Sequence, residues 1–192
     1  MNYIQVLFDY LGRIIDTVYL ICKQFCIFLK ASPSMDIVAF NKYFSWYQDT
    51  GHLELIQQQM TQKILGWKER FPDKPLFITE YGADTIAGMH TLPSFVFTED
   101  YQFELMRNHF KAFDAAREKG GFIGEMIWNF ADFMTKQEIT RVGGNKKGIF
   151  TRDRQPKASA HLMRRRYLSL AQQLDNFSAI DEQITDGVCP SI

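Results

Sequence analysis

The carboxylate of Glu80 directly follows a short apolar run, Leu76–Thr79, within the stretch ITEYGAD that spans residues 78–84. A β-branched run of this length is typical of a buried strand, so the sequence places an acidic side chain where a strand ends. A glutamate on a surface strand serves solubility alone. In a barrel of parallel strands the carboxyl ends of the strands carry the chemistry, and Glu80 is then a candidate nucleophile.

Aromatic and polar groups stand at the ends of two further expected strands. We expect strands over residues 36–44, 76–80 and 122–130. Tyr43 lies at the end of the first strand, and Trp128 and Asn129 lie near the end of the third. Because the carboxyl ends of parallel strands meet at one edge of a sheet, these side chains are expected to lie near Glu80.

Helical patterns alternate with these strands. Helices are expected over residues 53–71, from Thr98 to Gly120, and over about 156–173. The proline-flanked stretch FPDKP ends the first, Thr98 is a good N-cap for the second, and the pair Gly120–Gly121 ends it. Strands and helices in alternation, with short connections, predict an α/β domain with a parallel sheet covered by helices.

Composition excludes several classes of protein. Lysine plus arginine (22) equals aspartate plus glutamate (22), and this balance argues against a nucleic-acid binder. The run Arg164–Arg166 is expected to be the solvated end of a helix. Three cysteines give no disulfide framework. The four histidines are scattered without metal-ligand spacing, so neither a metal site nor a cofactor is expected.

The two ends of the chain differ from its centre. Residues 1–34 are rich in apolar residues but are interrupted by charges, so we expect an amphipathic helix rather than a membrane span. No basic start or small-residue cleavage site marks a signal peptide, and the chain as written would begin in the cytoplasm. Residues 35–173 are expected to form one domain, and residues 174–192 a flexible tail.

Four stretches of the central region carry a family resemblance. They read NKYFSWYQDTGHLELIQ, ITEYGADTIAG, GEMIWNFADFMT and RVGGNKKGIFTRDRQPKASA. From Met35 to Ser169 the chain resembles the C-terminal part of the catalytic barrel of the β-glucuronidases of glycoside hydrolase family 2. The resemblance implies a (β/α)8 TIM barrel, of which this chain holds only the C-terminal strands and helices. Residues 1–34 show no such resemblance.

The resemblance also assigns roles to particular residues. Glu80 matches the nucleophile of a retaining glycosidase, and Tyr43 matches a tyrosine that hydrogen-bonds it. Asn145 and Lys147 match an Asn-x-Lys motif that binds the carboxylate of the sugar. The residues that match the lining of the sugar pocket are Tyr47, Trp128 and Arg141. A retaining mechanism needs an ionised carboxylate that attacks the anomeric carbon, which suits Glu80.

The motif makes chemical sense for a uronic acid. Lys147 offers a cation and Asn145 an amide donor, and charge-assisted hydrogen bonds of this kind contribute roughly 1.5–3 kcal/mol each. A neutral sugar would leave Lys147 without a partner, which disfavours a β-galactosidase. Interpretations without a functional role stay open for three features: GGNKKG can be an ordinary polar turn, Trp128 a core residue, and Glu125 a structural carboxylate.

Half of the expected catalytic apparatus is missing from these 192 residues. The family's acid/base is a glutamate in an Asn-Glu pair upstream of the nucleophile, and the chain contains no Asn-Glu dipeptide. A whole barrel takes about 250 residues and eight strands, whereas three strands are expected here. We therefore expect a β-glucuronidase fragment that is inactive alone. The alternative is a non-catalytic half-barrel that pairs with full-length subunits through its open sheet.

The resemblance extends to partners and compartment. It implies a glucuronide or glycosaminoglycan-type carbohydrate as the substrate of the parent enzyme, and a homo-oligomer, commonly a tetramer. It implies the lysosome for an animal parent enzyme. No nucleic-acid or membrane partner is expected.

Overall fold

The structure is a computed structural model of the chain, and it describes residues 35–138, 141 and 143–175. The amphipathic helix expected within residues 1–34 lies outside the described residues. So does the expected tail, except for its first two residues, which continue the last helix.

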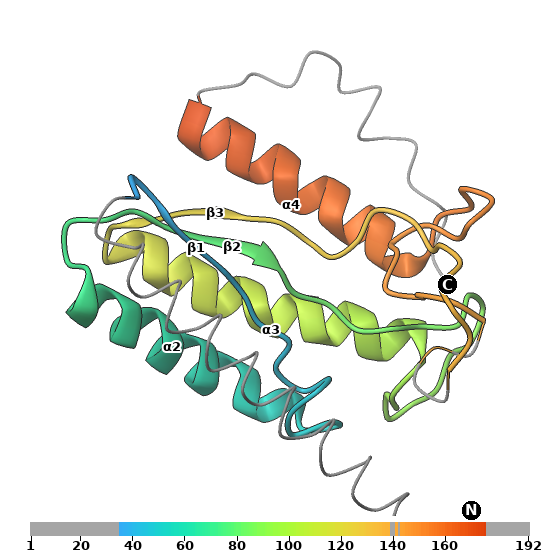
Figure 1. The fold of residues 1–192 in the computed structure, drawn as a ribbon. Helices are drawn as coiled ribbons and strands as arrows, with labels where there is room; N and C mark the ends of the chain where they lie inside the picture. The colour runs from blue at the N-terminus through green and yellow to red at the C-terminus, as the bar shows by residue number, and fades with distance from the viewer. Residues whose placement is uncertain (1–34, 139–140, 142, 176–192) are drawn as a thin grey trace, which may run out of the picture.

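The centre of the molecule is a parallel sheet of three strands in the order β1-β2-β3 (Figure 1). The strands are β1 (Val38–Asn41), β2 (Leu76–Glu80) and β3 (Phe122–Glu125). Both pairs of neighbours are parallel, as the alternation of strands and helices predicts. The expected limits of β2 are confirmed, including its end at Glu80.

The other two strands are shorter than expected, for local reasons. β1 ends at Asn41 because the chain turns at Tyr43, whose carbonyl accepts from the amides of Trp46 and Tyr47 at 3.3 Å. β3 ends at Glu125. The chain beyond it stays hydrogen-bonded to β2, because Met126 N donates to Ile78 O at 2.9 Å.

The helices form a layer against this sheet. They are α2 (Ile56–Arg70), which a 3-10 turn η2 (Leu53–Leu55) precedes, α3 (Glu99–Glu118) and α4 (Ala158–Asp175). α3 contacts both α2 and α4 and lies between them (Figure 1). The expected caps of α3 are confirmed: the Thr98 side chain accepts from Tyr101 N, and Gly120, with φ +83°, follows its end.

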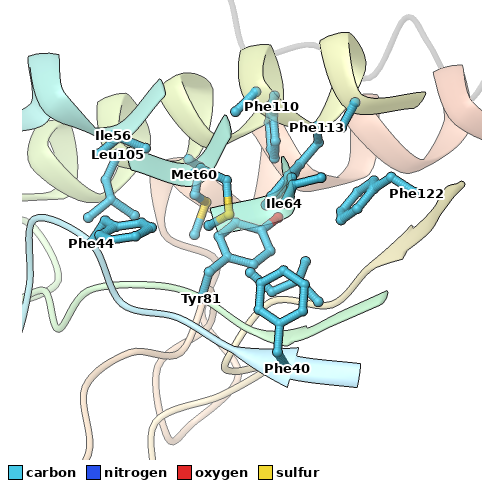
Figure 2. Packing of buried hydrophobic residues seen from close by; sticks show 14 of the residues in the cluster. Phe40, Phe44, Ile56, Met60, Ile64, Tyr81, Leu105, Phe110, Phe113 and Phe122 are labelled. Carbon is cyan, nitrogen blue, oxygen red and sulfur yellow. The ribbon is translucent and has the colours of Figure 1, made fainter. Parts of the chain in front are cut away.

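The core lies between the helices and one face of the sheet. Ile56, Met60, Ile64 and Trp67 are the buried face of α2, at the three- and four-residue steps of an amphipathic helix. Tyr81, the residue that follows β2, belongs to the same buried cluster as Met60 and Ile64 (Figure 2). Each fully buried apolar side chain of this size stabilises the fold by roughly 1.5–3 kcal/mol.

A buried ion cluster ties β3 to two helices and corrects one expectation. Glu125 has almost no exposed side chain and accepts from Arg117 of α3 at 2.6 Å and from Arg166 of α4 at 2.9 Å. Arg166 also binds Asp114. Glu125 therefore has a structural role, and it is the last residue of β3, whereas the expected strand over residues 122–130 placed it near the start. The expectation of a solvated arginine run is wrong for Arg166, because the middle of α4 packs onto α3.

His109 is a fully buried imidazole in the core. Its Nδ1 lies 2.9 Å from the Leu105 carbonyl and must donate to it, so Nε2 is the unprotonated nitrogen. The ring packs 5.1 Å from that of Tyr81. Burial lowers the pKa of His109 to about 4. The side chain is therefore neutral in the folded protein at neutral pH.

We expect His109 to make the protein less stable as the pH falls. In the unfolded chain His109 takes up a proton at its ordinary pKa of 6.5. In the folded chain it does so only at a pKa of about 4. The free energy of unfolding should then fall by roughly 2–3 kcal/mol between pH 6.5 and 4.5. Urea unfolding at several pH values measures this loss. It should shrink in His109→Phe and persist in His161→Gln, whose histidine is exposed. Equal losses in all three proteins would contradict the assignment.

Candidate active site

Glu80 and Tyr43 meet at the ends of neighbouring strands. The hydroxyl of Tyr43 donates to Oε2 of Glu80 at 2.6 Å. The two side chains are brought together because β1 and β2 are parallel neighbours, and Lys42 N extends their pairing by donating to Glu80 O at 2.9 Å. Tyr81, the next residue, is buried in the helix-facing core, so Glu80 is left half-buried at the sheet edge.

The protonation state of Tyr43 suits it as a permanent donor. Burial, reinforced by the hydrogen bond to Glu80 and by the negative charge of that carboxylate, raises the pKa of Tyr43 far above its usual value of 10. The phenol therefore keeps its proton over the whole physiological range. A carboxylate that accepts from a fixed hydroxyl has a defined orientation, which a nucleophile requires.

The loop that follows β2 is paired with the segment that contains the Asn-x-Lys motif. Thr85 N donates to Lys146 O at 3.0 Å, and Lys146 N donates to Oδ1 of Asp84 at 2.7 Å. A glycine is needed at position 82 for the loop to follow this course. Its φ of +150° is unfavourable for other residues, and a Cβ there would clash with the carbonyl oxygen of Trp128 at 2.5 Å. Residues 62 positions apart, Asp84 and Lys146, are thereby joined.

Lys147 is buried in an aromatic cage with one carboxylate. Its side chain is 1% exposed, and its ammonium pairs with Oδ2 of Asp84. Three rings surround the ammonium: those of Trp46 and Tyr47 have centroids 5.0 Å away, and that of Tyr43 lies 5.9 Å away. Rings present their negative faces to a cation, so this cage stabilises the charge as well as burying it.

Arg141 is the more accessible cation of the site. Its guanidinium donates to the hydroxyl of Tyr47 at 2.8 Å and lies 3.6 Å from Oδ2 of Asp84, with 27% of the side chain exposed. Burial alone would raise the pKa of Tyr47, but the hydrogen bond from Arg141 and the charge of Lys147 outweigh it and lower that pKa. The same hydrogen bond raises the pKa of Arg141.

Asn145 shapes the turn that carries Lys147. Its Oδ1 accepts from the backbone amide of Lys147 at 3.0 Å, and since an amide N–H can only donate, this assigns the oxygen of the side chain. The NH2 group therefore points to the opposite side of the amide. The backbone of Asn145 pairs with that of Phe133 through two hydrogen bonds. Asn145 N donates to Phe133 O at 2.8 Å, and Phe133 N donates to Asn145 O at 3.1 Å.

Trp128 stands apart from this group. It follows β3, its amide donates to the carbonyl of Tyr81 at 2.9 Å, and its half-buried indole packs edge-on against Phe133 at 6.3 Å. The core alternative is not supported, because Trp128 does not belong to the buried cluster.

Six of the seven expected site residues form one contiguous group. Tyr43 links its two parts, because it bonds Glu80 on one side and lies beside the Tyr47 ring, 5.1 Å away, on the other. Two contributors were missed: Asp84 and Trp46. Asp84 lies in the stretch ITEYGAD and Trp46 in the stretch NKYFSWYQD. No spacing in the sequence, however, pairs Asp84 with Lys147.

The arrangement combines a fixed carboxylate with an adjacent cationic pocket. A carboxylate of this kind can attack an electrophilic carbon, and a pocket with two cations and one carboxylate keeps a net positive charge for an anionic ligand.

In the described part of the chain, no group of three or more His, Cys, Asp or Glu side chains converges as a metal site would require. None of the helices described is long and apolar enough to cross a bilayer.

Parallel β/α units with polar side chains at the carboxyl ends of the strands are typical of a segment of a (β/α)8 barrel. Residues 3–172 match the family "Glycosyl hydrolases family 2, TIM barrel domain", and the chain belongs to that family. Its fold is a partial (β/α)8 barrel with three of the parallel strands described. The match begins well before residue 35, where the expected family region starts.

The similar proteins are β-glucuronidases. Those of Pongo abelii and Homo sapiens are each 51% identical over 144 residues, which is 75% of this chain and 22% of theirs. The chain therefore spans about a fifth of the length of these relatives. Among solved structures, the β-D-glucuronidase of Dictyoglomus thermophilum is 46% identical with a TM-score of 0.67, over 71% of this chain and 23% of that one. A Ruminococcus gnavus enzyme in complex with D-glucaro 1,5-lactone is 40% identical with a TM-score of 0.66, over 70% of this chain and 23% of its own.

We expect Gly82→Ala to destabilise the protein more than Gly88→Ala. Both glycines have positive φ, but only at Gly82 would the new methyl group meet a backbone carbonyl, whereas Gly88 faces open space. Backbone strain alone costs about 1–2 kcal/mol, and displacing Trp128 adds to it. Urea unfolding followed by tryptophan fluorescence compares the two variants. Equal losses of stability would show that the contact between Gly82 and Trp128 does not matter.

Proposed function

We propose that this chain supplies the nucleophile and the uronate-binding side of the active site of a retaining β-glucuronidase. The observation that carries the proposal is the hydrogen bond of 2.6 Å from Tyr43 to Glu80 at the ends of adjacent parallel strands. The similarity to named β-glucuronidases from mammals and bacteria supports the choice of sugar.

Glu80 acts in this proposal by forming a covalent intermediate. Its carboxylate attacks the anomeric carbon, a C–O ester bond forms, and the glycosidic C–O bond breaks. The departing oxygen takes a proton from a second carboxyl group, which in a retaining enzyme lies roughly 5–5.5 Å from the nucleophile. Water then cleaves the ester and releases the sugar. Tyr43 keeps its proton throughout and holds the attacking oxygen in place.

The cationic pocket provides selectivity for a uronic acid. Arg141 is exposed enough to meet an arriving carboxylate, and Asn145 can add an amide donor beside it. Lys147 supplies a second positive charge behind the rings of Tyr43 and Tyr47. A neutral sugar would leave one positive charge of the pocket uncompensated in a partly dehydrated site, because Asp84 neutralises only one of the two cations, and this costs affinity.

The chain alone is proposed to be inactive. Its sequence contains no Asn-Glu pair to match the acid/base of the family, so in this proposal the chain does not supply the proton for the leaving group. We propose that activity requires the acid/base from the rest of a full barrel.

A chimera tests the function directly. Residues 35–173 replace the matching segment of the full-length Homo sapiens relative, which is 51% identical over 144 residues. The chimera should hydrolyse a fluorogenic β-D-glucuronide. Glu80→Gln in the chimera should lower kcat by roughly a thousandfold or more, because the amide cannot attack. The exposed Glu69→Gln is the matched control and should leave kcat unchanged.

The free 192-residue chain should show no appreciable hydrolysis in the same assay. Hydrolysis by the free chain that Glu80→Gln abolishes would disprove the proposed need for an outside acid/base. A chimera that folds but leaves Glu80→Gln fully active would disprove the nucleophile assignment.

A second candidate function is binding to full-length subunits. Within the described ranges the sheet ends at β1 on one side and β3 on the other, and parallel strands are normally buried on both faces. Ile123 and Met126 are each 52% exposed, and Phe130 is 60% exposed. These side chains would be covered if strands from another chain continued the sheet.

Size-exclusion chromatography tests this second candidate. The free chain should co-elute with the full-length Homo sapiens relative, and Ile123→Asp with Met126→Asp should abolish co-elution by placing charges on the contact. The exposed Leu65 of α2 provides the control, since Leu65→Asp alters the helical side and should not interfere. Independent elution of the unmodified chain would rule out this function.

Compartment and assembly rest on the resemblance alone. We propose the lysosome for an animal parent enzyme, a glucuronide or glycosaminoglycan-type substrate, and assembly as a homo-oligomer.

A further inference from the structure

The carboxylate of Asp84 faces both cations of the pocket, Lys147 and Arg141. Its side chain is only 6% exposed, and its Oδ2 atom faces both the ammonium of Lys147 and, at 3.6 Å, the guanidinium of Arg141. One oxygen thus holds together two like charges that would otherwise repel. Two cations and one carboxylate leave one net positive charge, which a single uronate group would neutralise.

The backbone holds Asp84 rigidly in this position. Its other oxygen, Oδ1, accepts from Lys146 N at 2.7 Å. The flanking residues are pinned as well: Gln102 donates to the carbonyl of Ala83 at 2.9 Å, and Lys157 donates to that of Thr85 at 3.2 Å. All three residues from Ala83 to Thr85 are buried. Hydrogen bonds on both sides therefore hold Asp84 in place, and the side chains of Lys147 and Arg141 are positioned against it.

We propose that Asp84 is a positioning residue that holds Lys147 and Arg141 together as the uronate subsite and sets the net charge of that subsite. The role in sugar selection rests on the proposed function. The placement of Lys147 by Asp84 is a property of the chain itself.

Removing the charge of Asp84 has a definite consequence. In Asp84→Asn the side-chain oxygen can still accept from Lys146 N, so the backbone pairing is preserved. Lys147 is left without its carboxylate at a buried position, which is strongly unfavourable, and Arg141 now repels it. The ammonium should leave the aromatic cage toward solvent.

Ligand-free NMR of the 192-residue chain measures this placement. The Nζ atom of Lys147 lies over the Trp46 and Tyr47 rings, so ring currents should shift the signals of the adjacent Cε protons upfield of those of exposed lysines. Lys147→Met identifies the signals by removing them. Asp84→Asn should move them to the position of exposed lysines, while the exposed Asp73→Asn leaves them in place. Asp84→Glu, which restores the charge, should return part of the upfield shift.

Ligand titrations then measure selectivity. Methyl β-D-glucuronide and methyl β-D-glucoside differ only in carrying a carboxylate or a hydroxymethyl group. The unmodified chain should prefer the glucuronide, and Asp84→Asn should reduce the ratio of the two dissociation constants about tenfold. A merely structural role would weaken both ligands equally.

The outcomes separate the two proposals. An unchanged Lys147 signal in Asp84→Asn overturns the positioning role, and so does an unchanged or increased preference for the glucuronide. A shifted Lys147 signal in a chain that never preferred the glucuronide supports the placement of Lys147 by Asp84. That last result would instead count against the proposed uronate site.

Discussion

The structure of the site depends on one contact between distant segments, the pairing of the loop after β2 with the segment that carries the Asn-x-Lys motif. Thr85 N reaches Lys146 O, and Asp84 accepts from Lys146 N. Thr85 is buried and Lys146 is partly buried, and leaving a buried backbone group unpaired would cost about 1–3 kcal/mol. The contact is therefore costly to break, and it places β2, which ends at Glu80, beside the cationic pocket.

Buried charges secure that contact from behind. The ammonium of Lys157 donates to the carbonyls of Thr85 and Lys146 and to Oδ1 of Asp132, so one side chain binds both segments. Burial lowers the pKa of Lys157 even though Asp132 opposes the change, and burial likewise raises the pKa of Asp132. The pair is electrostatically costly, and its value lies in the geometry that it imposes.

The tyrosines connect this scaffold to chemistry. Tyr43 holds the carboxylate of Glu80 with its hydroxyl and presents its ring to Lys147, while Tyr47 covers the same ammonium and accepts from Arg141. The Glu80 carboxylate and the cationic pocket thus share the ring of Tyr43. In the proposed reaction, a sugar whose anomeric carbon meets Glu80 would direct its carboxylate toward these cations.

Local patterns in the sequence determined the elements: the end of β2 at Glu80, the cap of α3 at Thr98 and the buried face of α2 all follow from residues near one another in the chain. The family stretches predicted six side chains that the fold brings together. Only the tertiary structure decided the roles of Asp84, Trp46 and Arg166. Their partners lie dozens of residues away, and no periodicity records which buried charge a folded chain will place beside another. A buried ion needs a counterion, but which one is near is set by how the loops pack.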